Sequence, residues 1–424
     1  MLSIGLMTGT SMDGIDAALL ETNGKSHIKE LGHASLSYHP SYKILLKAAE
    51  YSVKKYQGDL NLAKADYSSA VSAYLKSELD LDDSCIAQKM FELSDYIYGN
   101  GRCDRPITFN DVVQYSTDLH VKVVNQLLSK KNLSAKAIDV IGYHGQTLFH
   151  RPEVGITIQI GNGQYLAEKL GITVVTDFRS QDVAQGGQGA PFAPLYHQAL
   201  AVRDKKMPVV VVNCGGIANI TVIKNDNEFD LIGFDTGPGN ALIDRLVRQR
   251  THGAQQMDEA GQYGRKGTMI PKILQALYEK SIIKDGCSYF KMKPPKSLDY
   301  GDMNLISELS SVSLEDACRT LEAFTADTIV SSIDFINIEI PNYWIVAGGG
   351  WENPIILQEL KNRLKQKLKG VVQIHTADQA GWKSQALEAQ IFAYLAVRRL
   401  QNQPISLPNI TGVAGALSGG QICK

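Results

Sequence analysis

The chain has 424 residues, of which 44% are hydrophobic and 21% are charged, and its formal net charge is −1. This length allows two or three globular domains, and the composition excludes a disordered chain. The balanced charge gives no overall attraction to nucleic acid, and no stretch approaches the roughly 20 apolar residues that a membrane span needs.

The cysteines and the first residues indicate a reducing compartment. No two cysteines are in CxxC spacing and no histidine cluster accompanies them, which argues against structural zinc and a disulfide framework. The short apolar run at residues 2–7 has no preceding basic residue and is too short for a secretory signal. We therefore expect a cytoplasmic protein. The six cysteines are Cys85, Cys103, Cys214, Cys287, Cys318 and Cys423.

The first half opens with three apolar runs, at residues 3–7, 16–22 and 27–38, the first two joined by a glycine turn. Runs of this kind predict strands, and the glycine turn predicts a hairpin. A helical insertion follows at residues 41–100. Two further strands are expected at 138–144 and 172–178, with a helix at 161–171 between them.

The second half repeats this order of elements. Strands are expected at residues 209–213, 219–223 and 229–234, again with a glycine turn after the first, and a second helical insertion at 253–310. Strands at 343–349 and 371–375 flank a helix at 354–368. Apolar residues three and four apart predict a last helix at 384–400.

Each half therefore reads βββαβαβα, which predicts a mixed α/β sheet. Two such units face each other in actin-like, ribonuclease H-like ATPases, with the active site in the cleft between the domains. We expect an N-terminal domain at 1–206, which would hold the glycine turn at 9–16 and the polar segment at 144–191. The C-terminal domain at 207–424 would hold the glycine segments at 215–216 and 348–350, and a helix at 190–203 would bridge the two domains.

The first glycine turn is a candidate phosphate loop. Small residues let backbone amides approach a phosphate closely, although an ordinary hairpin turn has the same composition. The GxxxxGK[ST] pattern and its lysine are absent, so this is not a Walker A loop. The candidate residues are Gly9, Thr10, Ser11, Met12, Asp13, Gly14, Ile15 and Asp16.

Three segments of the second half are further nucleotide-binding candidates. Gly215 and Gly216 form a turn that matches the first one in position. Asp235 follows a strand, with Gly237 close behind, and could hold Mg²⁺ through water, while the nearby Asn240 could be only a helix N-cap. The last segment, a glycine run after a strand, would let an adenine or ribose lie against backbone, or could be a plain tight turn. Its residues are Gly348, Gly349 and Gly350.

Residues 144–191 carry neutral hydrogen-bonding groups at strand ends, which suits a ligand with many hydroxyls. Candidate substrate-binding residues are His144, Gln146, Gln188 and Gly189. His144 could equally be a core histidine. Asp177 closes an apolar strand, so it is a candidate general base, or else a turn cap or an ion-pair partner of Arg179.

At this point the sequence resembles a known family. The segments GLMTGTSMDGIDAALLE, YHGQTLFHRP, ITVVTDFRSQDVAQGGQGAPFAPLYH, VNCGGIANIT, GFDTGPGNALID, KPPKSLDYGDMN and IVAGGGWENP are similar to those of the anhydro-N-acetylmuramic acid kinases, in the same order. So is LEAQIFAYLAVRRLQNQP followed by LPNITGVAGA. One stretch departs from the family, which usually has a glycine, a proline and an aspartate before the glutamate: here Lys383, Gln385 and Leu387 occupy that neighbourhood, while Glu388 is retained.

The resemblance implies an actin-like fold, the use of ATP and Mg²⁺, and 1,6-anhydro-N-acetylmuramic acid as substrate. The product would be N-acetylmuramic acid 6-phosphate, formed during recycling of cell-wall sugars, and the protein would be a homodimer. The residue that acts as the general base in the family corresponds to Asp177, and the family's ATP-contacting loop corresponds to residues 9–16.

Other functions stay open at this point. An actin-like kinase of another sugar would phosphorylate an existing hydroxyl without cleaving an anhydro bond. A regulator or chaperone of the same fold is expected to need a DNA-binding or peptide-binding extension. The first phosphate turn begins at residue 9, which leaves little room for an N-terminal one.

Overall fold

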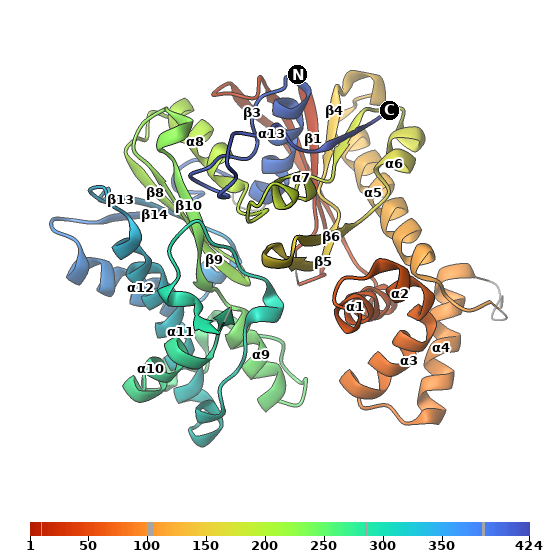
Figure 1. Ribbon diagram of the computed structural model, residues 1–424, viewed down its shortest axis with the longest axis horizontal. Helices are drawn as coiled ribbons and strands as arrows, with labels where there is room; N and C mark the ends of the chain where they lie inside the picture. Colours follow the sequence, from red (N-terminus) through yellow and green to blue (C-terminus); the bar gives the residue numbers. More distant parts are fainter. Residues whose placement is uncertain (10, 100–104, 285, 384–385) are drawn as a thin grey trace. The chain divides into compact units, whose positions relative to one another are not determined.

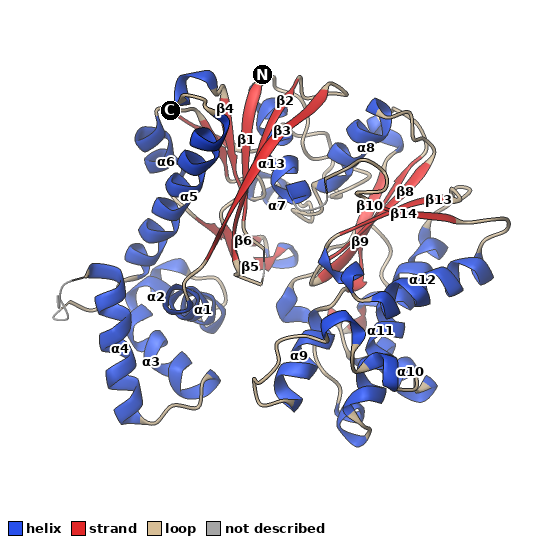
Figure 2. Ribbon diagram, turned by 180° about the vertical axis from the view of Figure 1, so that it is seen from behind, coloured by secondary structure: helices blue, strands red, loops and turns tan. Residues whose placement is uncertain are grey.

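The computed structural model describes residues 1–424 except 10, 100–104, 285 and 384–385. The protein is a mixed α/β structure that divides into two compact units (Figures 1 and 2). Unit 1 contains Met1–Gly189, Ala386–Ile405 and Leu417–Lys424, and unit 2 contains Ala190–Gln385 and Ser406–Ala416.

The main sheet of unit 1 has six strands in the order β15-β7-β4-β1-β2-β3. The first three strands of the chain form an antiparallel meander, and β4 and β7 extend it in parallel from β1. The strands are β1 (Leu2–Met7), β2 (Gly14–Thr22), β3 (Ile28–Ser37), β4 (Val140–Tyr143), β7 (Val174–Thr176) and β15 (Gln421–Cys423). A separate hairpin joins β5 (Gln146–Arg151) to β6 (Ile156–Ile160).

Helix α13 (Leu387–Leu400) packs across β1, β2 and β4 of unit 1, although it lies near the end of the chain. Two glycines make this close approach possible. A Cβ atom at Gly5 would lie 1.8 Å from the Ala389 carbonyl oxygen, and one at Gly142 would lie 2.0 Å from that of Phe392. Helix and sheet backbones therefore pack directly on each other at these two positions.

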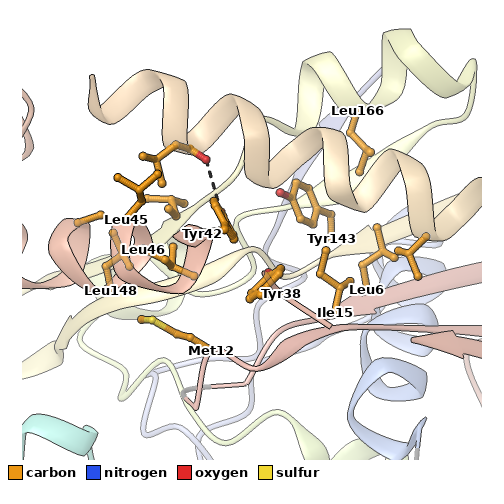
Figure 3. Close-up of a cluster of buried hydrophobic side chains, with 14 of the residues drawn as sticks. Leu6, Met12, Ile15, Tyr38, Tyr42, Leu45, Leu46, Tyr143, Leu148 and Leu166 are labelled. Carbon is orange, nitrogen blue, oxygen red and sulfur yellow. Dashed lines mark hydrogen bonds between the residues drawn. The ribbon is translucent and has the colours of Figure 1, made fainter. Parts of the chain in front are cut away.

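The helices between β3 and β7 pack around a different hydrophobic core, formed with Ile4 and Leu6 of β1 and without residues of α13. Helix α5 begins with a capping box formed by Thr108 and Asp111 and ends at Asn132 in the left-handed conformation. The helices of unit 1 besides α13 are α1 (Pro40–Lys55), α2 (Leu60–Ala65), α3 (Tyr67–Glu78), α4 (Asp83–Tyr98), α5 (Phe109–Lys131), α6 (Gly163–Leu170), α7 (Ser180–Ala184), η1 (Ala135–Ala137) and η2 (Pro152–Val154). Figure 3 shows part of this core, in which Met12 and Ile15 lie among buried leucines and tyrosines.

The sheet of unit 2 has five strands in the order β10-β9-β8-β13-β14. Its first three strands are antiparallel, and β13 and β14 continue in parallel from β8. The strands are β8 (Val209–Cys214), β9 (Ile217–Ile223), β10 (Ile232–Pro238), β13 (Tyr343–Ala347) and β14 (Gln373–Thr376), with a small pair formed by β11 (Ile283–Lys284) and β12 (Cys287–Ser288).

Helix α11, the longest of unit 2, packs against α9, α10, α12 and β10. The α-helices of this unit are α8 (Ala193–Arg203), α9 (Ala241–Arg250), α10 (Pro271–Lys280), α11 (Leu314–Ser331) and α12 (Pro354–Lys367). Short 3₁₀ turns are η3 (Glu228–Asp230), η4 (Glu259–Gly261), η5 (Gly264–Lys266), η6 (Tyr289–Lys291), η7 (Tyr300–Asp302), η8 (Ser307–Ser311), η9 (Ser332–Phe335) and η10 (Gly349–Glu352).

The expected fold class is confirmed, because both sheets place their first five strands in the chain order 3-2-1-4-5. This duplicated order is the actin-like arrangement. The compact units nevertheless differ from the expected domains 1–206 and 207–424. Helix α8 belongs to unit 2. Helix α13 belongs to unit 1, where its backbone packs against Gly5 and Gly142.

The second insertion also differs from the expectation of helices. In the described part of residues 253–310, the chain forms one α-helix, short 3₁₀ turns and the β11–β12 pair. None of the helices formed by the described residues combines the length and the apolar character that crossing a membrane would require.

Candidate functional site

In unit 1, the loop between β1 and β2 is anchored at its centre and open at its start. Met12 has a φ of 55° and is buried in the core, and its amide donates to the Gly9 carbonyl at 3.1 Å. Among the described residues, a Cβ atom at Gly9 would meet only the Ser11 hydroxyl, at 3.5 Å. The backbone at Gly9 can therefore be approached by a ligand. Thr10 lies outside the described residues.

The rest of the loop has structural contacts of its own. Asp13 forms an ion pair with Lys43 at 2.5 Å, and Asp16 accepts a hydrogen bond from Ser35 at 2.6 Å. A Cβ atom at Gly14 would lie 2.4 Å from the Leu36 carbonyl oxygen. The glycine at position 14 is thus required by the close approach of β3.

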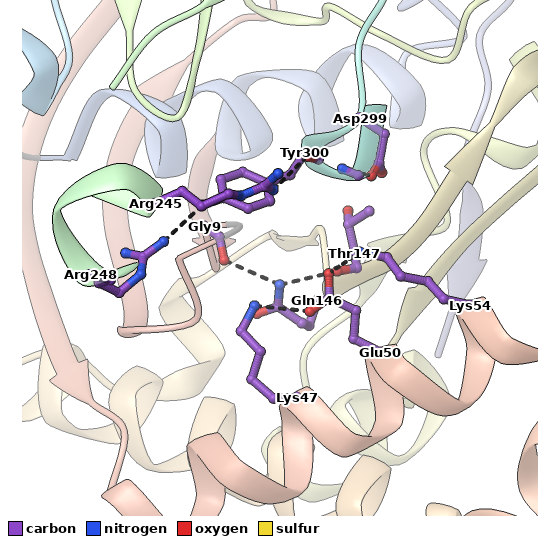
Figure 4. Close-up of polar contacts among 11 residues, drawn as sticks. Gly9, Lys47, Glu50, Lys54, Gln146, Thr147, Arg245, Arg248, Asp299 and Tyr300 are labelled. Carbon is purple, nitrogen blue, oxygen red and sulfur yellow. Dashed lines mark hydrogen bonds and ion pairs between the residues drawn. The ribbon is translucent and has the colours of Figure 1, made fainter. Parts of the chain in front are cut away.

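Gln146 begins β5 and is fully buried. Its amide nitrogen donates to the carbonyls of Gly9 at 3.2 Å and Thr147 at 3.3 Å (Figure 4). Its side-chain oxygen has no partner among the described residues. A buried acceptor without a partner is costly, so Gln146 is suited to receive a hydrogen bond from a ligand hydroxyl or amide.

His144 is buried, and both of its ring nitrogens are used. Nδ1 lies 2.7 Å from the Gly145 carbonyl oxygen, and Nε2 accepts from Arg179 at 2.9 and 3.0 Å. Burial and, to a lesser degree, the charge of Arg179 hold the pKa of His144 well below its usual range. His144 is thus neutral, and it accepts the hydrogen bonds that hold Arg179 in place.

Arg179 and Asp182 fix the glycine-rich segment at the end of the first stretch of unit 1, Met1–Gly189. Arg179 donates to the Gly189 carbonyl at 2.6 Å, and the Gly189 amide donates to Asp182 at 2.6 Å. A Cβ atom at Gly189 would lie 2.7 Å from Val183. The neighbouring Gln188 is half-buried. The sequence did not predict the role of Arg179 in this network, although this arginine lies only two residues after Asp177.

Asp177 follows β7 with a φ of 52°, a left-handed conformation that aspartate tolerates better than most residues. One carboxylate oxygen accepts from the Ser180 hydroxyl at 2.5 Å, and the other accepts from Gln421 at 3.2 Å. The half-buried carboxylate is therefore held from two sides. Gln421, on the three-residue strand β15, had no signal in the sequence.

In unit 2, the turn after β8 is joined to the segment that precedes α9. The amides of Gly239 and Asn240 donate to the carbonyls of Gly216 and Gly215 at 2.9 and 2.8 Å. A Cβ atom at Gly215 would meet nothing within 4 Å, whereas one at Gly239 would lie 2.0 Å from the Gly215 carbonyl oxygen. Gly215 is therefore open to a ligand. Asn240 occupies the N-cap position of α9, but its side chain makes no capping hydrogen bond.

Asp235 lies in β10, next to an irregularity in its pairing with β9. It is 5% exposed, and a carboxylate oxygen accepts from the Leu298 amide at 2.9 Å. A Cβ atom at Gly237 would lie 2.8 Å from the Thr328 hydroxyl, so close packing requires the glycine there. Farther along α9, Arg245 stacks on the Tyr300 ring and Arg248 donates to its hydroxyl (Figure 4).

The three glycines after β13 are not equivalent. Gly348 has a φ of 95°, and a Cβ atom there would lie 2.5 Å from the Cys214 carbonyl oxygen. A Cβ atom at Gly350 would lie 2.5 Å from the Cys214 sulfur, but one at Gly349 would meet nothing within 4 Å. Gly349 alone of the three is open. The following helix α12 is capped by Asn353, which accepts from the Ile355 amide at 3.0 Å.

Asn353 in turn donates to the buried carboxylate of Glu322 at 2.7 Å. Burial raises the pKa of Glu322 to about 8, the Asn353 hydrogen bond opposes the shift, and the charge of Asp258 adds to it. Because this pKa is higher in the folded than in the unfolded chain, stability falls as the pH rises from about 4.5 through 8.

Glu322→Gln should remove this loss, because glutamine imitates the protonated acid and does not titrate. We expect the variant to match the wild type at pH 4.5 and to exceed it at pH 9 by on the order of 2–4 kcal/mol. Urea unfolding at the two pH values measures the difference. A variant that is less stable at pH 9 would show that Glu322 is ionised in the folded protein.

The family model described as anhydro-N-acetylmuramic acid kinase matches residues 103–424. A protein of Zymomonas mobilis with that name is 38% identical over 422 residues, covering 100% of this chain and 99% of its own. Another from Methylobacterium nodulans is 37% identical over 423 residues, covering 99% of both chains.

Among solved structures, the ligand-bound xylulose kinase of Lactobacillus acidophilus aligns with a TM-score of 0.36 at 12% identity. The alignment covers 100% of this chain and 93% of the xylulose kinase chain. Likeness at this level is too low to argue from, so the fold assignment rests on the strand order of the two sheets. The family model and the full-length relatives show that the chain belongs to the anhydro-N-acetylmuramic acid kinase family.

Proposed function

We propose that the protein is an ATP-dependent kinase that opens 1,6-anhydro-N-acetylmuramic acid and phosphorylates O6. The product is N-acetylmuramic acid 6-phosphate, an intermediate in cell-wall sugar recycling. The observation that carries this proposal, beside family membership, is the Asp177 carboxylate, held at the end of a strand by Ser180 and Gln421.

The nucleotide role rests on backbone that ligands can approach. Gly9, Gly215 and Gly349 are three glycines of the candidate segments at which an added Cβ atom would meet no backbone or core atom closely. Amides at such positions can donate to phosphate oxygens or lie against a nucleoside. The remaining glycines with close contacts, Gly14, Gly237, Gly348 and Gly350, support the shapes of these loops.

Mg²⁺ is part of the proposal, with Asp235 as its protein partner through water. Among the described residues no group of three or more histidine, cysteine or acidic side chains is arranged to hold a metal. Magnesium suits such a site because it commonly keeps several waters and binds one or two carboxylates together with substrate phosphates. When bound, it would neutralise charge on the phosphates during transfer.

The sugar would be bound in unit 1 by Gln146, Gln188 and Gly189. The unpaired side-chain oxygen of Gln146 accepts a hydrogen bond from a hydroxyl or the acetamido group. The Gly189 backbone is fixed by Arg179 and Asp182, and His144 holds Arg179 in place. His144 therefore supports the sugar site through Arg179 and does not touch the sugar itself.

Asp177 takes the proton of a water that attacks C1. As the new C1–O bond forms, the C1–O6 bond breaks and O6 accepts the γ-phosphoryl group of ATP, whose bond to the β-phosphate oxygen breaks as ADP leaves. Phosphoryl transfer thus replaces the acid that a glycosidase needs to protonate its leaving oxygen. One carboxylate is then enough, and the hydrogen bonds from Ser180 and Gln421 keep it oriented.

Kinases that add phosphate to an existing sugar hydroxyl are the alternative, and the family assignment does not favour them. Purified protein incubated with ATP and the anhydrosugar should yield ADP and a ring-opened 6-phosphate by mass spectrometry. A phosphorylated sugar that retains the anhydro ring, or no phosphosugar at all, would overturn the proposal.

We also propose a cytoplasmic homodimer. The five described cysteines are free, which fits a reducing compartment, and ATP is available there. The dimeric state follows from the family resemblance. Light scattering on the purified protein should give twice the mass of one chain, and a mass of one chain would contradict the dimer.

A further inference from the structure

Lys296 is a buried lysine in the segment KPPKSLDYGDMN, which the proposed chemistry does not use. Its side chain is 2% exposed, and its ammonium donates to the Tyr289 carbonyl at 3.2 Å. Aromatic rings surround it: the ammonium lies 4.4 Å from the ring centre of Tyr289, 4.7 Å from that of Phe335 and 6.0 Å from that of Phe234.

This cation lacks an ion-pair partner. In the part of the chain that the structure describes, no carboxylate lies within 4.0 Å of the Lys296 ammonium, and the rings supply only cation–π attraction. A lysine ammonium buried among aromatic rings without a carboxylate beside it costs desolvation free energy that packing alone does not explain.

Lys284, in the same region, provides a contrast. It forms a buried ion pair with Asp302 at 3.1 Å and donates to the Ser297 carbonyl at 3.2 Å. Breaking such a pair leaves an uncompensated buried charge and destabilises a protein. Removing the charge of Lys296 leaves no such partner behind, so the two lysines should respond in opposite ways.

Lys296 is linked to Asp235 by a closed set of hydrogen bonds. The Lys296 ammonium donates to the Tyr289 carbonyl, and the Tyr289 hydroxyl donates to the Asp235 carbonyl at 2.6 Å. The Asp235 amide donates to the Lys296 carbonyl at 3.2 Å. The Leu298 amide, two residues on, holds the Asp235 carboxylate. The backbone and side chain of Asp235 are thus both fixed by residues 289–298.

We propose that Lys296 is a positioning residue for the nucleotide: it holds Asp235 through Tyr289 and places a buried positive charge beside the phosphate-binding strand. This inference rests on the proposed function, in which Asp235 serves the phosphates. Buried charges kept at a cost in stability are typical of functional sites. The positive charge and the positioning of Asp235 both favour a polyanionic nucleotide.

The test is MgATP binding by calorimetry together with thermal unfolding, for Lys296→Met and the control Lys284→Met. Methionine keeps the length of the side chain and suits an aromatic cage. Lys296→Met should unfold at the wild-type temperature or higher, with a Kd for MgATP raised about tenfold and an unchanged KM for the anhydrosugar. Lys284→Met should unfold at a lower temperature with an unchanged Kd for MgATP.

Tyr289→Phe is the second variant, because it removes only the hydroxyl that contacts Asp235, and its Kd for MgATP should also rise. An unchanged Kd in both Lys296→Met and Tyr289→Phe would overturn the inference, as would a loss of stability in Lys296→Met like that of Lys284→Met. A wild type that binds MgATP but makes no phosphosugar would count against the proposed function alone. A wild type that binds no MgATP would overturn both.

Discussion

Asp177→Asn is expected to lose turnover of the anhydrosugar by on the order of 10²–10⁴ or more while the protein still folds and binds ATP. Asparagine keeps the size of the side chain and can keep a hydrogen bond to Ser180, but it cannot accept the proton of the attacking water. Because ring opening and phosphoryl transfer are coupled, ADP and opened sugar should disappear together. Steady-state assays of both products measure the effect.

Ser180→Ala serves as the control, because it removes a hydrogen bond to the carboxylate and leaves the base in place. Its loss of activity should be much smaller than that of Asp177→Asn. An asparagine variant that makes 6-phosphosugar at close to the wild-type rate would exclude Asp177 as the base. An asparagine variant that no longer opens the ring but still phosphorylates the intact anhydrosugar would show that O6 is not the acceptor.

Gly349→Val should weaken ATP binding by about a hundredfold or more, because the branched side chain would occupy space that we assign to the nucleoside. The fold should tolerate it, since a Cβ atom at Gly349 meets nothing within 4 Å and no positive φ is required there. Calorimetry with ATP gives the affinity, and circular dichroism reports the fold.

Gly415→Val is the matched control, because Gly415 is equally open, belongs to the same unit and is not part of the proposed nucleotide loops. Its ATP affinity should equal that of the wild type. The same affinity in Gly349→Val would remove the adenosine role from this glycine run. Variants at Gly348 or Gly350 would be uninformative, because their Cβ atoms collide with Cys214.

The first five strands of each main sheet were predictable because each is a compact apolar run beside turn residues. The runs at residues 3–7 and 209–213 became β1 and β8, and the repeated order of elements predicted both sheets. The sheet against which the last helix packs was not predictable from the periodicity of its apolar residues. The apolar face of α13 indicates burial, but only Gly5 and Gly142, both in strands, reveal which sheet it covers.

Individual site residues were harder to predict than motifs. The sequence indicated glycine loops, but open positions such as Gly349 and structural ones such as Gly348 differ only in their surroundings. His144 read as a ligand residue or a core histidine, and its hydrogen bonds to Gly145 and Arg179 favour a supporting role. Gln421 reaches Asp177 through a contact between residues 244 positions apart, which no local pattern encodes.

The most direct test of the central proposal is the reaction in water enriched in ¹⁸O, with the product analysed by mass spectrometry before its anomeric oxygen exchanges with solvent. If water attacks C1 and O6 accepts the phosphoryl group, the product carries one ¹⁸O at C1 and none in the phosphate. An unlabelled phosphosugar, or label in the phosphate group, would contradict the account.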